Sequence, residues 1–279
     1  MRRRFFEVDV FGRGPLAGNP LAVVLDAGDL SSEAMQQFAA WTNFSETTFL
    51  VPPTSDAADY GVRIFTTTTE LPFAGHPTLG SARAWLASGA VPLVAGQLTQ
   101  ECGVGLVTVQ IDAGERLRFA APELRRFEPL APGLRREIEA SLGLDPSQVM
   151  DASWVDNGPG WIGLRLTSAH EVRAVVPGGL RHPVGIVGPL GEDDEAAYEV
   201  RAFFPEAGTV LEDPVTGSLH ASIAKWHLER GWLSAPFLAV QGSQVGRDGV
   251  ISISEHHGQL FVGGAARVVV EGMVAVADR

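Results

Sequence analysis

The sequence predicts a mixed α/β protein, of the α+β class, that is built from two related halves. The chain has 279 residues, of which 45% are hydrophobic and 19% charged, so it can bury one large core or two ordinary ones. Short strand-like stretches bounded by glycine and proline alternate with a few helix-like stretches. A stretch of twenty residues also recurs 142 positions further along the chain. This repeat is the main reason to expect two halves of similar structure.

The repeated stretch is residues 70–89, E-L-P-F-A-G-H-P-T-L-G-S-A-R-A-W-L-A-S-G, and its second copy is residues 212–231, E-D-P-V-T-G-S-L-H-A-S-I-A-K-W-H-L-E-R-G. Six positions are identical, namely Glu70/Glu212, Pro72/Pro214, Gly75/Gly217, Ala82/Ala224, Leu86/Leu228 and Gly89/Gly231. The glycines indicate a tight turn that leads into a helix and a left-handed residue that ends it. Because a helix start carries unpaired, partly positive N–H groups, each copy predicts a seat for an anion. Two such seats suggest a site built between related halves.

The remaining elements follow from hydrophobic patterns and turn residues. A helix is expected to begin at Ser31 or Ser32 and to end near Trp41. Its apolar side would carry Met35, Phe38, Ala39 and Trp41. Another helix is expected at residues 132–142. Strands, some of them in pairs, are expected at residues 5–11, 21–25, 45–51, 60–67, 98–111, 154–166, 172–176, 198–204, 238–241, 250–254, 259–262 and 266–271.

The boundary between the halves is expected between residues 113 and 132. The N-terminal half then spans residues 1–115, with residues 270–279 as candidates to complete it, and the C-terminal half spans residues 116–269.

Charge and cysteine content exclude several classes of function. The formal net charge of −12 argues against nucleic-acid binding, which needs a basic surface. No long apolar run predicts a membrane span or a signal peptide, and the single cysteine, Cys102, fits a reducing compartment. We therefore expect a cytoplasmic protein. His256-His257, His220 and His227 form no known metal-ligand spacing, so no metal site is expected.

Glu46 is the first candidate for chemistry. It lies in N-F-S-E-T-T-F-L-V, where burial among apolar and β-branched neighbours would raise its pKa from about 4.3 toward that of a general acid/base. The alternative is a glutamate that points outward from a half-exposed strand, and periodicity alone favours it.

Two further candidates flank the repeated glycine turns. His76 lies in the first turn of the first helix, where it would shuttle a proton or donate to a carboxylate, or simply bond to backbone. Asp213 precedes Pro214 and would hold a histidine or a substrate amine, or serve as a turn former.

Other patterns are weaker. Ser218 and His220 lack the G-x-S-x-G context of a hydrolase nucleophile. Residues 241–249, Q-G-S-Q-V-G-R-D-G, lack the lysine of a phosphate-binding loop, so we expect a hairpin loop with Arg247 as a candidate anion contact.

These segments together resemble the PhzF-like family, within the diaminopimelate epimerase-like fold. The matching segments are V-D-V-F at 8–11, G-N-P-L-A-V-V at 18–24, S-E-T-T-F at 45–49, F-A-G-H-P-T-L-G at 73–80, E-D-P-V-T-G-S at 212–218, Q-G-x-x-V-G-R at 241–247 and V-G-G-x-A at 262–266. They cover nearly the whole chain in the family's order. The loop at residues 246–249 departs from the family pattern because no proline follows Arg247.

The resemblance implies two pseudo-symmetric halves, each a mixed sheet or barrel around a central helix, with the active site in the cleft between them. It implies no cofactor and a homodimer. The implied activity is that of an isomerase acting on a small cyclic or amino-bearing carboxylate, as in the isomerisation of trans-2,3-dihydro-3-hydroxyanthranilate. The implied catalytic residues are Glu46, as the proton shuttle, with His76 and Asp213 assisting. The implied substrate-binding residues are Asn19, Gly75, Pro77, Thr78, Gly217 and Ser218.

Racemases of this fold use a cysteine at each helix start, and this chain has Gly75 and Gly217 there. A two-thiol racemase is therefore excluded. Two alternatives to the isomerase remain: a ligand-binding or interaction protein without catalysis, and a hydrolase acting through Ser218.

Overall fold

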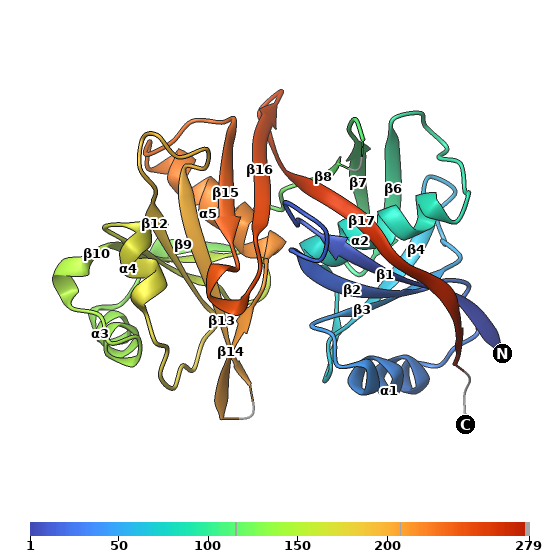
Figure 1. Cartoon of the computed structure of the whole chain (residues 1–279), viewed down its shortest axis with the longest axis horizontal. Helices are drawn as coiled ribbons and strands as arrows, with labels where there is room; N and C mark the ends of the chain where they lie inside the picture. Colours follow the sequence, from blue (N-terminus) through green and yellow to red (C-terminus); the bar gives the residue numbers. More distant parts are fainter. Residues whose placement is uncertain (115, 207, 277–279) are drawn as a thin grey trace. The chain divides into compact units, whose positions relative to one another are not determined.

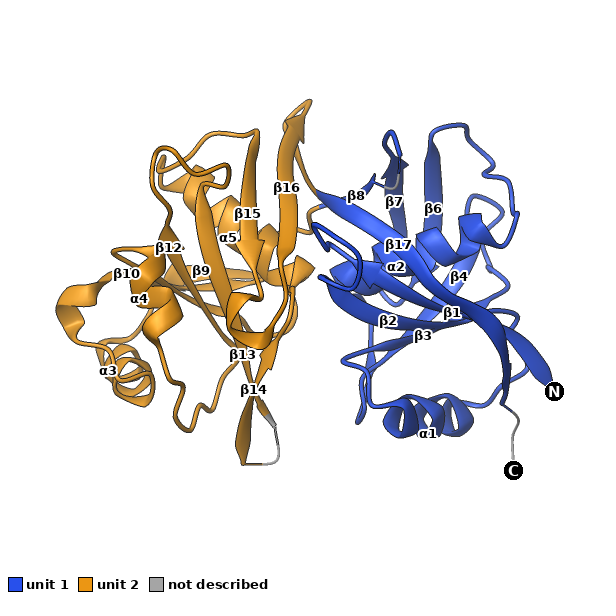
Figure 2. Ribbon diagram, viewed as in Figure 1, with its two compact units in different colours: residues 1–120, 263–279 blue, residues 121–262 orange. Residues whose placement is uncertain are grey.

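The computed structural model describes residues 1–114, 116–206 and 208–276, and the chain divides into two compact units (Figure 2). Unit 1 comprises Met1–Ala120 and Gly263–Arg279, and unit 2 comprises Ala121–Val262. Position 115, the expected end of the N-terminal half, and the last three positions of the expected 270–279 segment lie outside the described residues.

Unit 1 is a mixed sheet with two helices. Its elements are β1 (Arg2–Val10), β2 (Asn19–Val24), α1 (Ser32–Thr42), β3 (Thr47–Val51), β4 (Tyr60–Phe65), β5 (Glu70–Leu71), α2 (Gly75–Ala87), β6 (Gln97–Cys102), β7 (Gly105–Ile111), β8 (Arg116–Ala120) and most of β17 (Gln259–Ala275). β1 pairs antiparallel with β2 and with β17. β2 and β3 are parallel and joined by α1, and β4 and β6 are parallel and joined through α2. Four further pairs, β3–β4, β4–β5, β6–β7 and β7–β8, are antiparallel, and β8 also pairs with β17.

Unit 2 repeats this order of pairing. Its elements are β9 (Arg126–Pro129), α3 (Pro132–Ser141), the 3₁₀ turn η1 (Pro146–Gln148), β10 (Val149–Asp156), β11 (Ile162–Leu166), α4 (Ala169–Ala174), β12 (Val184–Pro189), β13 (Tyr198–Glu206), β14 (Thr209–Asp213), α5 (Gly217–Glu229), β15 (Phe237–Gln241), the 3₁₀ turn η2 (Ser243–Val245) and β16 (Gly249–His256). β11 and β12 are parallel and joined by α4, and β13 and β15 are parallel and joined through α5. The antiparallel pairs β10–β11, β12–β13, β13–β14 and β15–β16 correspond to those of unit 1. The predicted pair of related halves is therefore present as a repeated topology.

The helix of each repeated stretch is the centre of its unit. α2 and α5 both have 13 residues, and nine residues of each are buried. Figure 1 shows each of these helices among the strands of its own unit. A helix with this much of its surface buried must be largely surrounded by its own sheet, since only a narrow polar face is left for solvent. Both helices stop before glycines with positive φ, 89° at Gly89 and 66° at Gly231, as the sequence predicts.

Three local predictions are wrong. Residues 172–176 were expected as a strand, but α4 ends there, and Ser168 caps it by accepting from the N–H of Glu171. The apolar run is too short for periodicity to tell a strand from a single buried helical turn. Trp41 is 81% exposed, because it lies about 240° around α1 from the buried Met35. The strands expected at 259–262 and 266–271 are one continuous strand, β17.

Among the residues that the structure describes, no helix has the length and apolar character needed to cross a bilayer.

Gly80 lets α2 pack directly on the sheet. A Cβ atom at this position would lie 2.4 Å from Cδ2 of Leu21 and 3.1 Å from Cγ2 of Val10, both of them core residues. We expect Gly80→Ala to lower the free energy of unfolding by about 1–3 kcal/mol because the core must shift to fit the methyl group. Gly133→Ala is the matched control, since its Cβ meets nothing within 4 Å on the exposed side of α3. Urea unfolding of both variants measures the difference, and equal midpoints would contradict the close packing.

Candidate functional site

Glu46 and His76 lie close together in unit 1. Glu46 immediately precedes β3, and His76 lies in the first turn of α2. Oε2 of Glu46 is 3.5 Å from Nδ1 of His76, and the two side chains are 17% and 4% exposed. The glutamate is therefore mostly enclosed and faces an imidazole.

Chain topology explains this proximity. β2 and β3 are parallel, with Ala22 opposite Thr47, so the residues just before these positions lie at the same end of the sheet. At that end β2 begins with Asn19 and Pro20, and β3 is preceded by Glu46. α2 packs on both strands and places His76 at its own start. The starts of three elements thus bring together Asn19, Glu46 and His76.

Burial makes His76 a neutral imidazole. Desolvation lowers its pKa from 6.5 to about 3, and a hydrogen bond with the Pro20 backbone only partly opposes this shift. A neutral ring has one N–H donor and one acceptor nitrogen. A neutral His76 beside the Glu46 carboxylate makes no buried ion pair.

The start of α2 holds the other predicted residues of unit 1. Gly75 is the first helical residue, and Gly75, Pro77 and Thr78 are all buried. The Thr78 hydroxyl donates to the carbonyl of Ala74 at 2.9 Å and accepts from Nε2 of Gln100 at 2.9 Å. This hydroxyl is thus engaged within unit 1, holding the first turn of the helix.

Unit 2 holds Asp213, Gly217 and Ser218. Asp213 ends β14, and its Oδ2 accepts from the hydroxyl of Thr216. Gly217 is the first residue of α5. Oγ of Ser218 accepts from Trp161 Nε1 at 3.2 Å, and the Ser218 carbonyl accepts from Nδ2 of Asn157 at 2.9 Å.

The contacts of Cys102 and Arg247 lie within their own turns. Burial raises the pKa of the Cys102 thiol, and its Sγ lies 3.6 Å from the Gly105 carbonyl oxygen. The backbone N–H of Arg247 donates to the carbonyl of Gly242 and closes the turn at η2.

Sequence reasoning gave no role to Asp9, a buried carboxylate on β1. Its Oδ1 accepts from the backbone N–H of Gly18 at 2.7 Å, which ties down the loop that leads into Asn19. Burial raises the pKa of Asp9, and the backbone N–H of Gly18 opposes that shift. The V-D-V-F segment was the available signal, but it does not show which backbone groups the carboxylate would bind.

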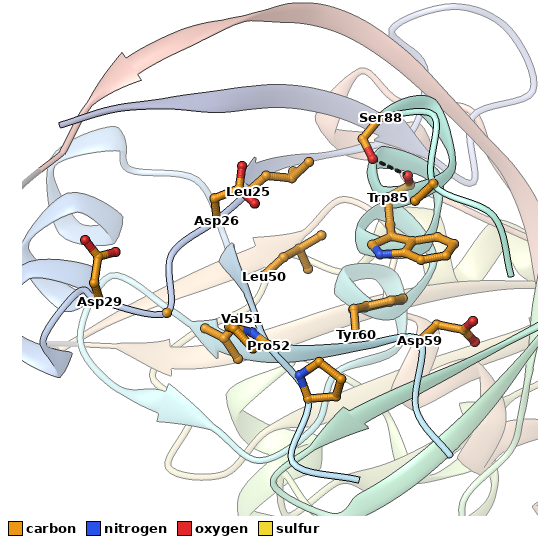
Figure 3. A pocket seen from close by; sticks show the side chains of 13 residues that line it. Leu25, Asp26, Asp29, Leu50, Val51, Pro52, Asp59, Tyr60, Trp85 and Ser88 are labelled. Atoms are coloured by element: carbon orange, nitrogen blue, oxygen red, sulfur yellow. Dashed lines mark hydrogen bonds between the residues drawn. The ribbon is translucent and has the colours of Figure 1, made fainter. Parts of the chain in front are cut away.

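A cavity of about 590 Å³ in unit 1 lies apart from these residues (Figure 3). Its wall includes Trp85, which stacks on Tyr60 with ring centroids 5.7 Å apart, and neither Glu46 nor His76 lines it. Trp85 is nine positions beyond His76, or about 14 Å further along the helix. The cavity is therefore not the site that the sequence predicts.

The buried histidines predict a loss of stability in mild acid. Burial lowers the pKa values of His76 and His220 to about 3 and that of His227 to about 4, each from 6.5. Below pH 6.5 the unfolded chain takes up protons that the folded chain excludes, so stability is full above that pH and falls as the pH drops. Each histidine would contribute a slope of up to about 1.4 kcal/mol per pH unit between pH 6.5 and 5.

Urea unfolding at several pH values measures this slope. We expect His227→Phe to reduce it by one histidine's share, whereas the exposed control His170→Gln keeps it. An unchanged slope in His227→Phe would contradict the burial of a neutral ring.

Comparison with known proteins identifies the family to which the chain belongs. The family model for PhzC-PhzF, described as phenazine biosynthesis-like protein, matches residues 8–275. Antisense-enhancing sequence 1 of Schizosaccharomyces pombe is 36% identical, with 96% of this chain and 97% of that protein covered. The trans-2,3-dihydro-3-hydroxyanthranilate isomerase of Pseudomonas chlororaphis is 32% identical, with 86% of each chain covered.

Solved structures agree in fold. A PhzF-family protein of Bacillus anthracis matches with a TM-score of 0.82 at 23% identity, covering 99% of this chain and 100% of that one. A probable proline racemase of Agrobacterium radiobacter matches with a TM-score of 0.61 at 13% identity, covering 99% and 93%. Both matches reflect a shared fold alone. The chain thus belongs to the PhzC-PhzF, phenazine biosynthesis-like family, and it is an enzyme of the isomerase class.

Proposed function

We propose that the protein is a cofactor-independent isomerase that moves a proton between two carbons of a small carboxylate, with Glu46 as the acid and base. The observation that carries this proposal is the enclosed Glu46 carboxylate, 3.5 Å from a neutral imidazole. The substrate class is a cyclic or amino-bearing carboxylate, because a relative that is 32% identical is named for trans-2,3-dihydro-3-hydroxyanthranilate.

The reaction needs no co-reactant. The Glu46 carboxylate removes a proton from one carbon, so that a C–H bond breaks, an O–H bond forms and the electron pair moves into a conjugated enolic or dienamine system. The carboxylic acid so formed then returns the proton to a different carbon, and the double bond shifts. His76 would orient Glu46 and the substrate, and because its ring stays neutral it leaves the negative charge of the base available.

Binding of the substrate carboxylate is assigned to the helix starts. In the described part of the chain, neither α2 nor α5 has a side-chain hydrogen bond that caps its first turn. Backbone N–H groups of Gly75 and His76 and of Gly217–Leu219 would therefore donate to an anion, since Pro77 has no N–H and that of Thr78 donates to the Ala74 carbonyl. Asp213 would accept a hydrogen bond from the substrate's amino or hydroxyl group, with Asn19 and Ser218 as further contacts. The homodimer and the cytoplasmic location stay predictions.

A binding role beside catalysis is the second candidate. It is supported by the relative from Schizosaccharomyces pombe, which is 36% identical and whose name describes an effect on antisense function rather than an isomerase. Retention of Glu46, His76 and Asp213 favours catalysis, because a pure binding scaffold has no need of a shielded acid/base.

Deuterium uptake from D₂O tests the proton shuttle. We expect the wild type to incorporate deuterium into trans-2,3-dihydro-3-hydroxyanthranilate or a related carboxylate, followed by NMR. Glu46→Gln should lower the rate by about 10²–10⁴-fold, because the amide cannot accept the proton. Glu33→Gln, an exposed change on α1, is the matched control and should keep the wild-type rate.

Equal exchange by wild type and Glu46→Gln across a panel of carboxylates would reject the shuttle. Thermal shifts then test the second candidate: stabilisation by a nucleotide or protein ligand, with no effect of any carboxylate, would identify a binding role.

A further inference from the structure

Gln241, at the end of β15, holds the start of α5 through all the hydrogen-bonding groups of its amide. Its side chain is 2% exposed. Oε1 accepts from the backbone N–H of Thr216 at 3.0 Å and lies 3.0 Å from Nε2 of His220. Nε2 of Gln241 donates to the Asp213 carbonyl at 2.8 Å and to the Thr216 hydroxyl at 3.0 Å. A primary amide has two donors and two acceptor positions, so all four are used.

The backbone partners set the direction of every bond in this group. The Thr216 N–H must meet an acceptor and the Asp213 carbonyl must meet a donor, so the two ends of the Gln241 amide cannot be exchanged. The Thr216 oxygen accepts from Gln241, and its own hydrogen goes to Oδ2 of Asp213. His220 is neutral and donates from its Nε2–H, because the amide oxygen can only accept. Donation therefore runs from His220 through Gln241 and Thr216 to the Asp213 carboxylate.

Unit 1 has a corresponding glutamine but lacks the last two members of this series of hydrogen bonds. Gln100 lies 141 positions before Gln241, on β6, which pairs with β4 as β15 pairs with β13. It donates to Thr78 and accepts from the Tyr60 hydroxyl at 3.3 Å. The positions that correspond to Asp213 and Thr216, 142 residues earlier, hold Leu71 and Ala74. A unit of this topology thus forms without the aspartate–threonine pair, and the two residues are present together or absent together.

Thr216 does not form the hydrogen bond that usually explains a threonine at its position. It occupies the N-cap position of α5, where threonine commonly accepts from an N–H of the first turn. No such bond is formed, because the hydroxyl is committed to Asp213 and Gln241. Helix capping therefore does not explain the residue.

We infer that Thr216 is a positioning residue for Asp213, held in register by Gln241, and that its hydroxyl fixes the carboxylate in the one orientation that meets the substrate. This inference rests on the proposed function in that Asp213 contacts the substrate. The hydrogen-bonded arrangement itself can be tested without any substrate.

Two measurements test the arrangement directly. Crystal structures of Thr216→Ser and Thr216→Val should show the Asp213 side chain unchanged in the serine variant and reoriented in the valine variant, which keeps the shape of threonine but has no hydroxyl. Nitrogen-15 NMR should find His220 as the Nε2–H tautomer. An Nδ1–H tautomer, or an Asp213 orientation that is the same in both variants, would overturn the inference.

Kinetics test the consequence. Thr216→Val should lower kcat by about 10–100-fold, since a misplaced polar group costs this much, with a smaller change in KM. Thr216→Ser should stay within about threefold of wild type. Ser153→Ala removes another buried hydroxyl of unit 2, one that donates to the Glu128 carbonyl, and as the matched control should keep the full rate.

A double-mutant cycle separates positioning from general stability. In an Asp213→Leu background, which copies Leu71 of unit 1, Thr216→Val should cause no further loss. A loss of the same size in both backgrounds would overturn the inference. If Asp213→Leu alone keeps full activity, the role proposed for Asp213 is wrong. The crystal structures and the NMR experiment still show whether the Thr216 hydroxyl orients the Asp213 side chain. If Thr216→Val does not fold, Thr216→Ala, which copies Ala74, replaces it.

Discussion

Each unit depends on the burial of one helix inside its own sheet. Nine of the thirteen residues of each of α2 and α5 are buried, so these helices are stable only where strands surround most of their surface. A helix held in this way begins at a fixed position. A fixed helix start keeps an acid/base side chain and a bound anion in place. Gln100 and Gln241 strengthen this constraint because each ties a helix start to a neighbouring strand through a buried side chain.

The same burial sets the electrostatics. A histidine inside such a helix loses access to water and stays neutral, as His76 and His220 do. Neutral imidazoles give hydrogen bonds a defined direction without adding charge to the interior. In unit 1 this leaves Glu46 facing an uncharged ring, and in unit 2 it begins a chain of donors that ends on Asp213.

Much of the fold could be predicted because the sequence contains the same turn-and-helix stretch twice. The glycines at both ends of residues 70–89 and 212–231 define the central helices, and alternation defines most strands. Prediction failed where a short apolar run has no distinct period, as at Val172, and where one position around a helix decides exposure, as at Trp41. The proximity of Glu46 and His76 depends on the parallel register of β2 and β3, which periodicity does not reveal. The bonds of Gln241 and Thr216 depend on tertiary contacts of the same kind.

The two units differ in how their chain is assembled. Unit 2 is one continuous segment, whereas β1 of unit 1 pairs with the far end of β17, with Arg2 opposite Ala275. During synthesis one edge of β1 therefore stays unpaired until nearly the whole chain has been made. Contacts between such distant residues are slow to form, and an exposed strand edge invites pairing with other chains. Unit 2 has all of its strands earlier, so the half that carries Asp213 is free to fold first, and the half that carries Glu46 is completed last.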